Sequence, residues 1–239
     1  MPVREKIILA LDVSDGTQAL DIVDRFKDYV GVFKVGLELF LSVGPDIVRE
    51  IARREKEVFL DLKFHDIPNT VSKAAVAAAR LGVYMLNVHA SGGLDMMRRC
   101  RESVIEVCLK ENIRKPKTLA VTVLTGLSQE ALKGELGIQH TIKTHVKQLS
   151  RVAREAGLDG VVASGHEASM IRSHFGKGFL VVTPGIRASW SPPDDQRRTV
   201  TPREAVREGA DYIVLGRTVL QHPDPVKALE LITTEILTA

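Results

Sequence analysis

The residues best suited to chemistry are Asp61, Lys63 and Asp66, which follow a short apolar run. Side chains two apart on a strand share a face, so Asp61 and Lys63 point to one side and Leu62 to the other. Lys34, after another apolar run, adds a second cation. Flanking carboxylates favour the ammonium form of Lys63, a good proton donor and a poor nucleophile. The pattern therefore favours proton transfer over Schiff-base formation. Schiff-base formation stays open, however, because a neighbouring cation such as Lys34 favours the free amine that it requires.

A second group of polar residues is suited to binding an anion. Gly216 and Arg217 follow the last apolar run of the chain, and a glycine N–H can approach a phosphate closely. A short helix from Thr218 onward would direct its N-terminus to the same place. Arg187 and Gln196 belong to a polar segment of the kind that closes over ligands. A turn with a solvated arginine is the ordinary alternative, but the position at a strand end favours a phosphate site.

Short apolar runs alternate with longer amphipathic segments along the whole chain. We expect helices between the strands, and this alternation is typical of a parallel sheet with right-handed crossovers. The expected strands are 6–11, 32–35, 58–62, 85–89, 118–124, 160–163, 179–183 and 212–215. The expected helices are 16–29, 45–54, 70–80, 94–110, 140–156, 166–174, 202–208 and 225–237.

About eight strand–helix repeats are the number that closes a (β/α)8 barrel. An open doubly wound sheet is the alternative, but it normally carries a glycine-rich nucleotide fingerprint directly after its first strand. Here the first strand leads into Asp12 and Val13 without such glycines. The sequence therefore predicts an α/β fold, a single (β/α)8 TIM-barrel domain over residues 1–239, with no linker dividing the chain.

Loops at the carboxyl ends of barrel strands build active sites. The predicted loops 125–139 and 184–201 are the longest of these, and the second is rich in Pro, Arg, Asp and Ser. Polar residues at the strand ends are Asp12, Lys34, Asp61, Lys63, Asn87, His89 and Thr125. A structural ion-pair network is the alternative for the charged ones, but burying several charges at one barrel end costs several kcal/mol, which favours function.

The charge and aromatic content of the chain indicate which kinds of ligand it can bind. The net charge is +3 and aromatic residues make up 5% of the chain, so a base-stacking nucleic-acid surface is not indicated. A small anionic ligand held by a few cations agrees better with this composition than a polyanion does. The apolar run 7–11 is too short to span a bilayer, and no leader-like segment precedes it, so we expect a cytoplasmic location and no membrane contact.

The cysteines and histidines do not indicate a metal site. Cys100 and Cys108 lie in one expected helix without Cys-x-x-Cys or Cys/His clustering, so we expect reduced structural thiols. No set of His, Cys and carboxylate residues has transition-metal spacing. His89 is either part of the pocket lining or a satisfied buried histidine. We expect His65 to face away from Lys63.

The charged cluster resembles the signature of the orotidine 5′-monophosphate decarboxylase family. Asp61, Lys63 and Asp66, followed by Ile67-Pro68-Asn69-Thr70, carry the resemblance. It continues at Leu11-Asp12, Phe33-Lys34-Val35-Gly36, Asn87-Val88-His89-Ala90, Leu119–Thr125, Pro184-Gly185-Ile186-Arg187, Asp194-Asp195-Gln196-Arg197 and Gly216-Arg217. The Asp-x-Lys-x-x-Asp core is shared with sugar-phosphate decarboxylases and synthases. The Ile-Pro-Asn-Thr extension and the Asp-Asp-Gln segment are similar to the orotidylate branch.

This resemblance implies a cofactor-free decarboxylation of orotidine 5′-monophosphate in pyrimidine synthesis. Asp61 would lie beside the substrate carboxylate, and Lys63 would protonate C6 after carbon dioxide leaves. Lys34 and Asp12 would bind the ribose hydroxyls. Thr125 would contact the pyrimidine. Arg187, Gly216 and Arg217 would hold the phosphate, and Gln196 would bridge phosphate and base. Asp66 and Thr70 would enter the partner subunit's site in a homodimer.

Two other functions stay open at this point. One is a keto-sugar-phosphate decarboxylase or synthase of the same suprafamily, which would use Mg²⁺ with the Asp array. The other is a barrel that binds phosphorylated ligands without catalysis. The complete set of Asp61, Lys63 and Asp66 disfavours a barrel without catalysis.

Overall fold

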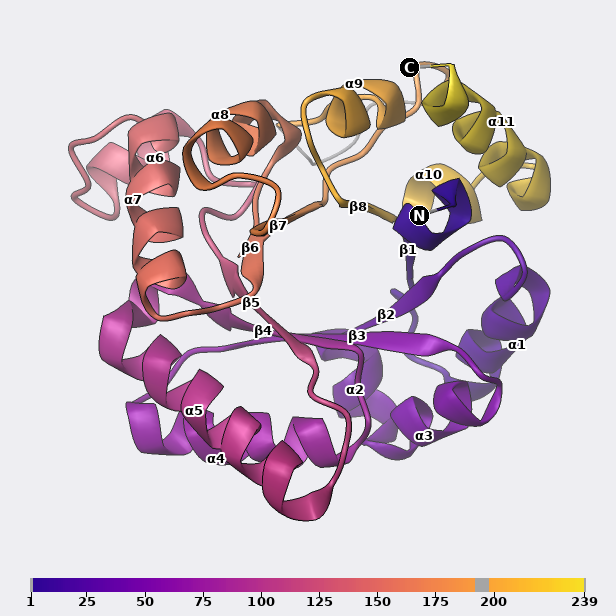
Figure 1. Cartoon of the computed structure of the whole chain (residues 1–239). Helices are drawn as coiled ribbons and strands as arrows, with labels where there is room; N and C mark the ends of the chain where they lie inside the picture. Colours follow the sequence, from indigo (N-terminus) through magenta and orange to yellow (C-terminus); the bar gives the residue numbers. More distant parts are fainter. Residues whose placement is uncertain (1, 192–197, 239) are drawn as a thin grey trace.

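Eight parallel strands form a closed barrel in a computed structural model that describes residues 2–191 and 198–238 (Figure 1). Each strand pairs with the next along the chain, and β8 closes the ring by pairing with β1. The strands are β1 Ile7–Ala10, β2 Val32–Gly36, β3 Glu57–Phe64, β4 Met85–His89, β5 Lys117–Val121, β6 Gly160–Val162, β7 Leu180–Thr183 and β8 Tyr212–Leu215. The predicted (β/α)8 barrel is confirmed.

Helices surround this ring on the outside (Figure 1). Many begin at a side-chain cap, as α7 does where Thr141 accepts a hydrogen bond from the backbone N–H of Thr144. The helices are α1 Gly16–Phe26, α2 Leu37–Val43, α3 Asp46–Arg53, α4 Pro68–Arg80, α5 Gly93–Glu111, α6 Gln129–Gly134, α7 Ile142–Glu155, α8 Gly165–Phe175, α9 Pro202–Arg207, α10 Arg217–Leu220 and α11 Pro225–Leu237. Short 3₁₀ helices cover Val3–Lys6 and Ala90–Gly92.

The element boundaries differ from the sequence prediction in a few places. β3 continues to Phe64 instead of ending at residue 62, and β5 ends at Val121 instead of residue 124. Two short helices, α2 and α6, were not among the expected ones, whereas α10 begins one residue before the short helix expected from Thr218. Both unexpected helices have at most seven residues, too few for apolar periodicity to be visible in the sequence.

Two apolar layers follow from the alternation of side chains along the strands. One layer fills the barrel interior and consists of Ile8, Val32, Phe59, Met85, Leu119, Val182 and Tyr212. The other lies between strands and helices and includes Leu9, Phe33, Leu60 and Leu86. The residue two positions beyond each interior residue points to the carboxyl end of the barrel. This rule directs Lys34, Asp61 and Asn87 into the same space.

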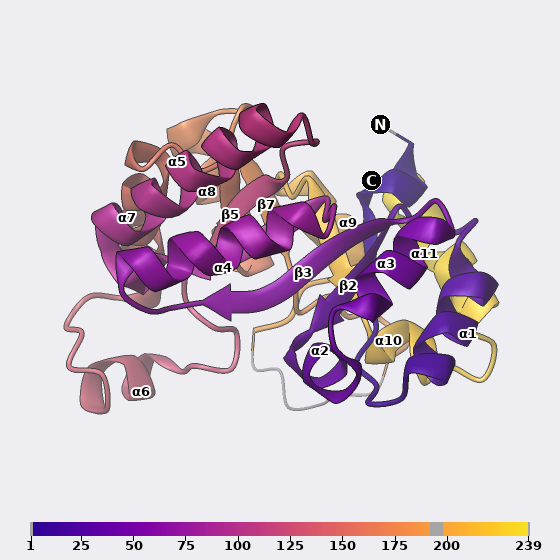
Figure 2. The same ribbon diagram turned by 90° about the horizontal axis from the view of Figure 1, so that it is seen from below.

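The amino end of the barrel is closed by a pair of tyrosines. The hydroxyl groups of Tyr84 and Tyr212 lie 2.7 Å apart and share a hydrogen bond. Figure 2 shows α2, α6 and α10 together at one end of the barrel, away from the two chain termini. Because the interior is filled in this way, the carboxyl ends of the strands are where a barrel of this kind binds its ligand.

Both cysteines are buried, free thiols on α5, as predicted. Burial raises the pKa of the Cys100 thiol to about 12, so this group is inert near neutral pH. Among the described residues, no helix is long and apolar enough to cross a membrane.

The interior layer predicts a large stability difference between two leucines. Leu119 is fully buried in the barrel interior, whereas Leu109 on α5 is 79% exposed. We expect Leu119→Ala to lower the free energy of unfolding by about 2–5 kcal/mol because it removes buried apolar contacts and leaves a cavity. Leu109→Ala, the control, should change it by less than about 0.5 kcal/mol in denaturant titrations. Equal effects of the two substitutions would contradict the two-layer packing.

Candidate active site

A cavity of about 240 Å³ lies at the carboxyl ends of the strands. Small apolar side chains, such as those of Ala10, Val121 and Val214, form its floor. Eight residues expected at the site line it together: Asp12, Lys34, Asp61, Lys63, Thr125, Arg187, Gly216 and Arg217. The structure thus brings into one cavity residues that lie on β2, β3 and the segments after β1, β5, β7 and β8.

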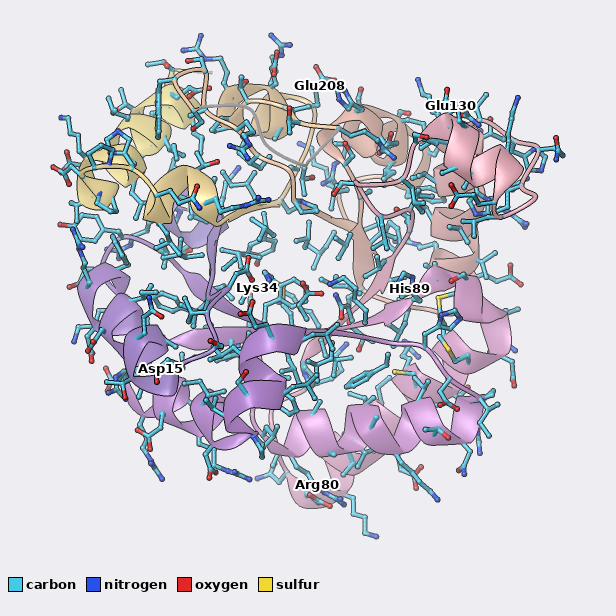
Figure 3. The ribbon with its side chains drawn as sticks, turned by 180° about the vertical axis from the view of Figure 1, so that it is seen from behind. Asp15, Lys34, Arg80, His89, Glu130 and Glu208 are labelled. Carbon is cyan, nitrogen blue, oxygen red and sulfur yellow. The ribbon has the colours of Figure 1, made fainter. Side chains whose placement is uncertain are left out.

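Charges of opposite sign alternate along one side of this cavity. The Lys34 Nζ lies 2.9 Å from Asp12 Oδ1 and 3.6 Å from Asp61 Oδ2. The Lys63 Nζ lies 2.8 Å from Asp61 Oδ1. Figure 3 shows Lys34 at the centre of the ring, while Arg80, Glu130 and Glu208 lie on its outside. Asp61 is therefore held between two ammonium groups.

Burial and charge act in opposite directions on Asp61, whose side chain is 13% exposed. Burial alone raises the pKa of its carboxyl group. The positive charges of Lys34 and Lys63, with hydrogen bonds from Lys63 and Asn87, more than offset burial and hold the pKa below its usual range. Asp61 is consequently a carboxylate at neutral pH, and it fixes the direction of the Lys63 side chain.

Lys63 reaches the cavity from an irregular part of β3. Leu60 pairs with Leu86 and Phe64 with Val88, so the register of β3 and β4 shifts between these pairs. Lys63 has φ +50°, in the left-handed region that residues other than glycine seldom adopt. Both Asp61 and Lys63 line the cavity as predicted, but the regular strand assumed for Lys63 was wrong because of this bulge.

Asn87 was predicted to be one of the polar residues at the strand ends, but no role at the site was assigned to it. Its Nδ2 donates to Asp61 Oδ1 at 2.7 Å, and its Oδ1 accepts the backbone N–H of Lys63 at 2.8 Å. The sequence did contain one indication of its role, which is an amide side chain at an inward-facing strand position, two residues after the interior Met85. Sequence alone did not reveal the bulge that gives this amide its two partners.

Two arginines line the cavity from the segments after β7 and β8. Arg187 follows β7, and Arg217 follows Gly216 at the start of α10. Two contacts fix the base of the loop after β7: Arg187 N–H donates to Val200 O at 2.9 Å, and Thr218 Oγ1 donates to Ile186 O at 3.0 Å. The two guanidinium groups, with the Gly216 backbone beside Arg217, are suited to a phosphate group.

The loop after β7 has a second anchor near residue 198. The Arg198 guanidinium forms an ion pair with Glu167 of α8, and both side chains are largely buried. Val200 also pairs with Ile186 in an isolated bridge. Gln196, a predicted ligand contact, lies outside the described residues, as do Asp194, Asp195 and Arg197.

Asp66 and Thr70 do not belong to the lining of this cavity. Both are exposed at the start of α4, where they line a separate shallow groove together with Lys63. The Asp66 Oδ1 accepts the backbone N–H of Ile67 at 2.6 Å. Within one chain, these two residues therefore approach Lys63 from outside the cavity.

The two histidines near the site pack against each other. The ring centroids of His65 and His89 lie 5.4 Å apart. Burial lowers the pKa of His89, and His65 and Lys63 lower it further despite Asp61. His89 is half-buried and is not one of the described residues that line the cavity, which favours packing over ligand contact. The residues described here contain no cluster of three His, Cys, Asp or Glu side chains placed to hold a metal ion.

Comparison with known proteins explains this arrangement. A model of the orotidine 5'-phosphate decarboxylase / HUMPS family matches residues 5–232. The chain belongs to this family. It is 51% identical to the orotidine 5'-phosphate decarboxylase of Moorella thermoacetica over 236 residues, which cover 99% of this chain and 94% of that protein. The Pseudoalteromonas atlantica protein of the same name is 49% identical, with 97% and 98% covered.

Solved structures of this decarboxylase family share the fold. The crystal structure of orotidine 5'-phosphate decarboxylase from Lactobacillus acidophilus has a TM-score of 0.85 and 35% sequence identity, covering 97% of this chain and 99% of that one. The resemblance proposed from the charged cluster is thus confirmed at the level of the family. The assignment of roles to individual residues depends on the site geometry.

The electrostatics of the site predict an unusual titration of Asp61. We expect its ¹³C carboxyl signal to titrate below the ordinary value of 3.8, and Lys34→Met to raise the midpoint. Lys27→Met, beside the exposed Asp24, is the control and should leave Asp61 unchanged. Because the pKa of Asp61 is lower in the folded state than in the unfolded state, this carboxylate stabilises the fold above about pH 4. That stabilisation is lost as the pH falls through the folded-state pKa. A midpoint above 3.8 would contradict the description.

Proposed function

We propose that this chain, as one catalytic domain, decarboxylates orotidine 5′-monophosphate to uridine 5′-monophosphate and carbon dioxide in pyrimidine synthesis. The observation that carries the proposal is the pairing of two features in one cavity. The Lys34–Asp61–Lys63 array and the pair of arginines, Arg187 and Arg217, line the same cavity. Relatives about half identical over nearly the whole chain bear the name orotidine 5'-phosphate decarboxylase, which supports this substrate.

The reaction needs a cation at the reacting carbon. When the bond between C6 and the carboxylate breaks, its electron pair stays on C6 in the plane of the ring, where the π system cannot delocalise it. An ammonium held beside C6 stabilises this charge and then transfers a proton to it. In this proposal Lys63 is that ammonium, and its salt bridge with Asp61 holds the Nζ in place.

The remaining cavity residues bind the rest of the nucleotide. Arg187, Gly216 and Arg217 hold the phosphate, and Gln196 bridges phosphate and base. Asp12 and Lys34, whose charged groups are 2.9 Å apart, bind the ribose hydroxyls. Thr125 contacts the edge of the pyrimidine. Phosphate contacts far from C6 contribute binding energy that orders the charged array, so truncated substrates lose turnover as well as affinity.

We further propose a homodimer with shared sites. Asp66 and Thr70 are exposed beside Lys63, in a groove separate from the cavity of their own chain. Ile67, which directly follows Asp66, is 66% exposed, so an apolar side chain lies on the surface beside these polar ones. A second copy covering this groove would bury Ile67 and bring Asp66 and Thr70 to its own cavity.

The decisive experiment follows the ultraviolet absorbance of orotidine 5′-monophosphate with purified protein in EDTA, without added cofactor. Loss of the orotate chromophore supports the proposal and its independence of metal. An unchanged spectrum with folded protein would contradict it. Activity on keto-sugar phosphates that requires Mg²⁺ would then indicate the other reaction type, and phosphate-ligand binding alone a barrel without catalysis.

Replacement of Lys63 should separate catalysis from binding. We expect Lys63→Ala to lower kcat by about 10²- to 10⁴-fold, the range for loss of a positioned proton donor. Binding of uridine 5′-monophosphate should persist, since the phosphate contacts remain. Lys73→Ala on α4 is the control and should leave kcat unchanged. Normal turnover of Lys63→Ala would rule out Lys63 as the proton donor.

Replacement of Arg217 should chiefly weaken substrate binding. Arg217→Ala removes a charge-assisted hydrogen bond to phosphate, so we expect KM to rise about ten- to hundred-fold. Arg99→Ala, on the exposed side of α5, serves as the control. Steady-state kinetics over a range of substrate concentrations measure both. An unchanged KM for Arg217→Ala would refute a phosphate contact.

Mixed dimers test the shared site. Lys63→Ala and Asp66→Ala subunits should each be inactive alone. Random exchange of subunits in an equal mixture makes about half of the dimers hybrids. Each hybrid has one intact site of its two, so mixing should recover roughly a quarter of wild-type activity. Two different affinity tags verify that hybrids form. No recovery in verified hybrids would contradict sites built from two subunits.

A further inference from the structure

Asn87 is a buried amide that no part of the proposed reaction yet uses. It is 1% exposed and lies on β4 between Leu86 and Val88, which are fully buried. Its side chain points to the carboxyl end of the barrel, as expected two residues after the interior Met85. A buried amide needs partners for its donors and its acceptor, so the partners of Asn87 reveal its role.

The acceptor of Asn87 fills a gap in the sheet. Leu60 and Phe64 pair with Leu86 and Val88, so Asp61, Leu62 and Lys63 all lie opposite Asn87 alone. In a β-bulge, the strand with the extra residues has backbone groups that lack hydrogen-bond partners on the neighbouring strand. The backbone N–H of Lys63 donates instead to Asn87 Oδ1 at 2.8 Å. The side chain thereby replaces a backbone partner where β4 supplies none.

The donor of Asn87 reaches the charged array. Its Nδ2 donates to Asp61 Oδ1 at 2.7 Å, and the same oxygen accepts from Lys63 Nζ at 2.8 Å. The orientation of the amide is fixed by its partners, because a backbone N–H only donates and a carboxylate only accepts. Asn87, Asp61 and Lys63 form a closed ring of hydrogen bonds that includes both the backbone and the ammonium of Lys63.

We propose that Asn87 is a positioning residue that holds the left-handed backbone of Lys63 and, through Asp61, the direction of its ammonium group. A lysine at φ +50° is strained, and its long side chain has many rotamers, so an unsupported Lys63 would not stay aimed at one point. Aspartate at position 87 lacks the donor and leucine lacks both groups. Only the amide serves both partners with this shape.

The first test uses the ligand-free protein and does not depend on the proposed function. We expect Asn87→Ala to speed hydrogen exchange at the Lys63 amide and to raise the midpoint of the Asp61 carboxyl titration, both measured by NMR. Asn87→Leu, which is close in shape and lacks both groups, serves if the alanine variant unfolds. Leu86→Ala is the control because it lies next to Asn87 and faces the helices. It should lower stability and leave both signals in place.

The second test is kinetic, and its interpretation rests on the proposed decarboxylation. Asn87→Ala should lower kcat about ten- to hundred-fold, as expected for losing a hydrogen bond to a charged group, with KM nearly unchanged. The acid limb of the kcat/KM profile should move to higher pH, following Asp61. Leu86→Ala should show neither change.

The outcomes separate the two proposals. A wild-type protein that does not consume orotidine 5′-monophosphate refutes the proposed function, while the NMR signals still test Asn87. Wild-type exchange at Lys63 and an unmoved Asp61 titration in a folded Asn87 variant would overturn the positioning role. So would a variant with unchanged kcat and pH profile in an active enzyme.

Discussion

The carboxylate of Asp61, held between two ammonium groups, is the interaction on which the rest of the site depends. Burying a carboxylate alone costs several kcal/mol, and a buried charge is stable only with close partners and hydrogen bonds. Lys34, Lys63 and Asn87 supply them within 3.6, 2.8 and 2.7 Å. In return Asp61 fixes the two cations, which would repel each other if the carboxylate were absent. The array is therefore a unit whose members stabilise one another.

The barrel fold provides a place where such a charged array can be buried. Alternation along the strands directs apolar side chains into the interior up to the layer of Phe59 and Met85, and polar ones into the space above it. The filled interior excludes water from below and strengthens electrostatic interactions in the cavity. The array comes from the adjacent strands β2 and β3, whereas Arg187 and Arg217 follow β7 and β8. A phosphorylated ligand that spans the cavity contacts both.

Sequence patterns were sufficient for the fold because the signals were local. Mainly apolar runs of four to seven residues identified all eight strands, and the polar residues and glycine at or after their ends identified eight of the cavity residues. The bulge in β3 was not predictable, because the register depends on β4, which is distant in sequence. The same limit hid the role of Asn87. Asp66 and Thr70 were placed at a partner's site from family resemblance alone, and one chain shows only that they lie outside its own cavity.

The central claim is that an ammonium held at position 63 performs the reaction. Its most direct test is the kcat of Lys63→Cys for orotidine 5′-monophosphate before and after alkylation with 2-bromoethylamine, which rebuilds an ammonium side chain of nearly lysine length. Equally treated wild-type and Lys63→Ala proteins control for Cys100 and Cys108, which are buried. We expect an inactive cysteine variant that recovers at least about ten-fold in kcat on alkylation. A folded, fully alkylated variant without recovery would contradict this account.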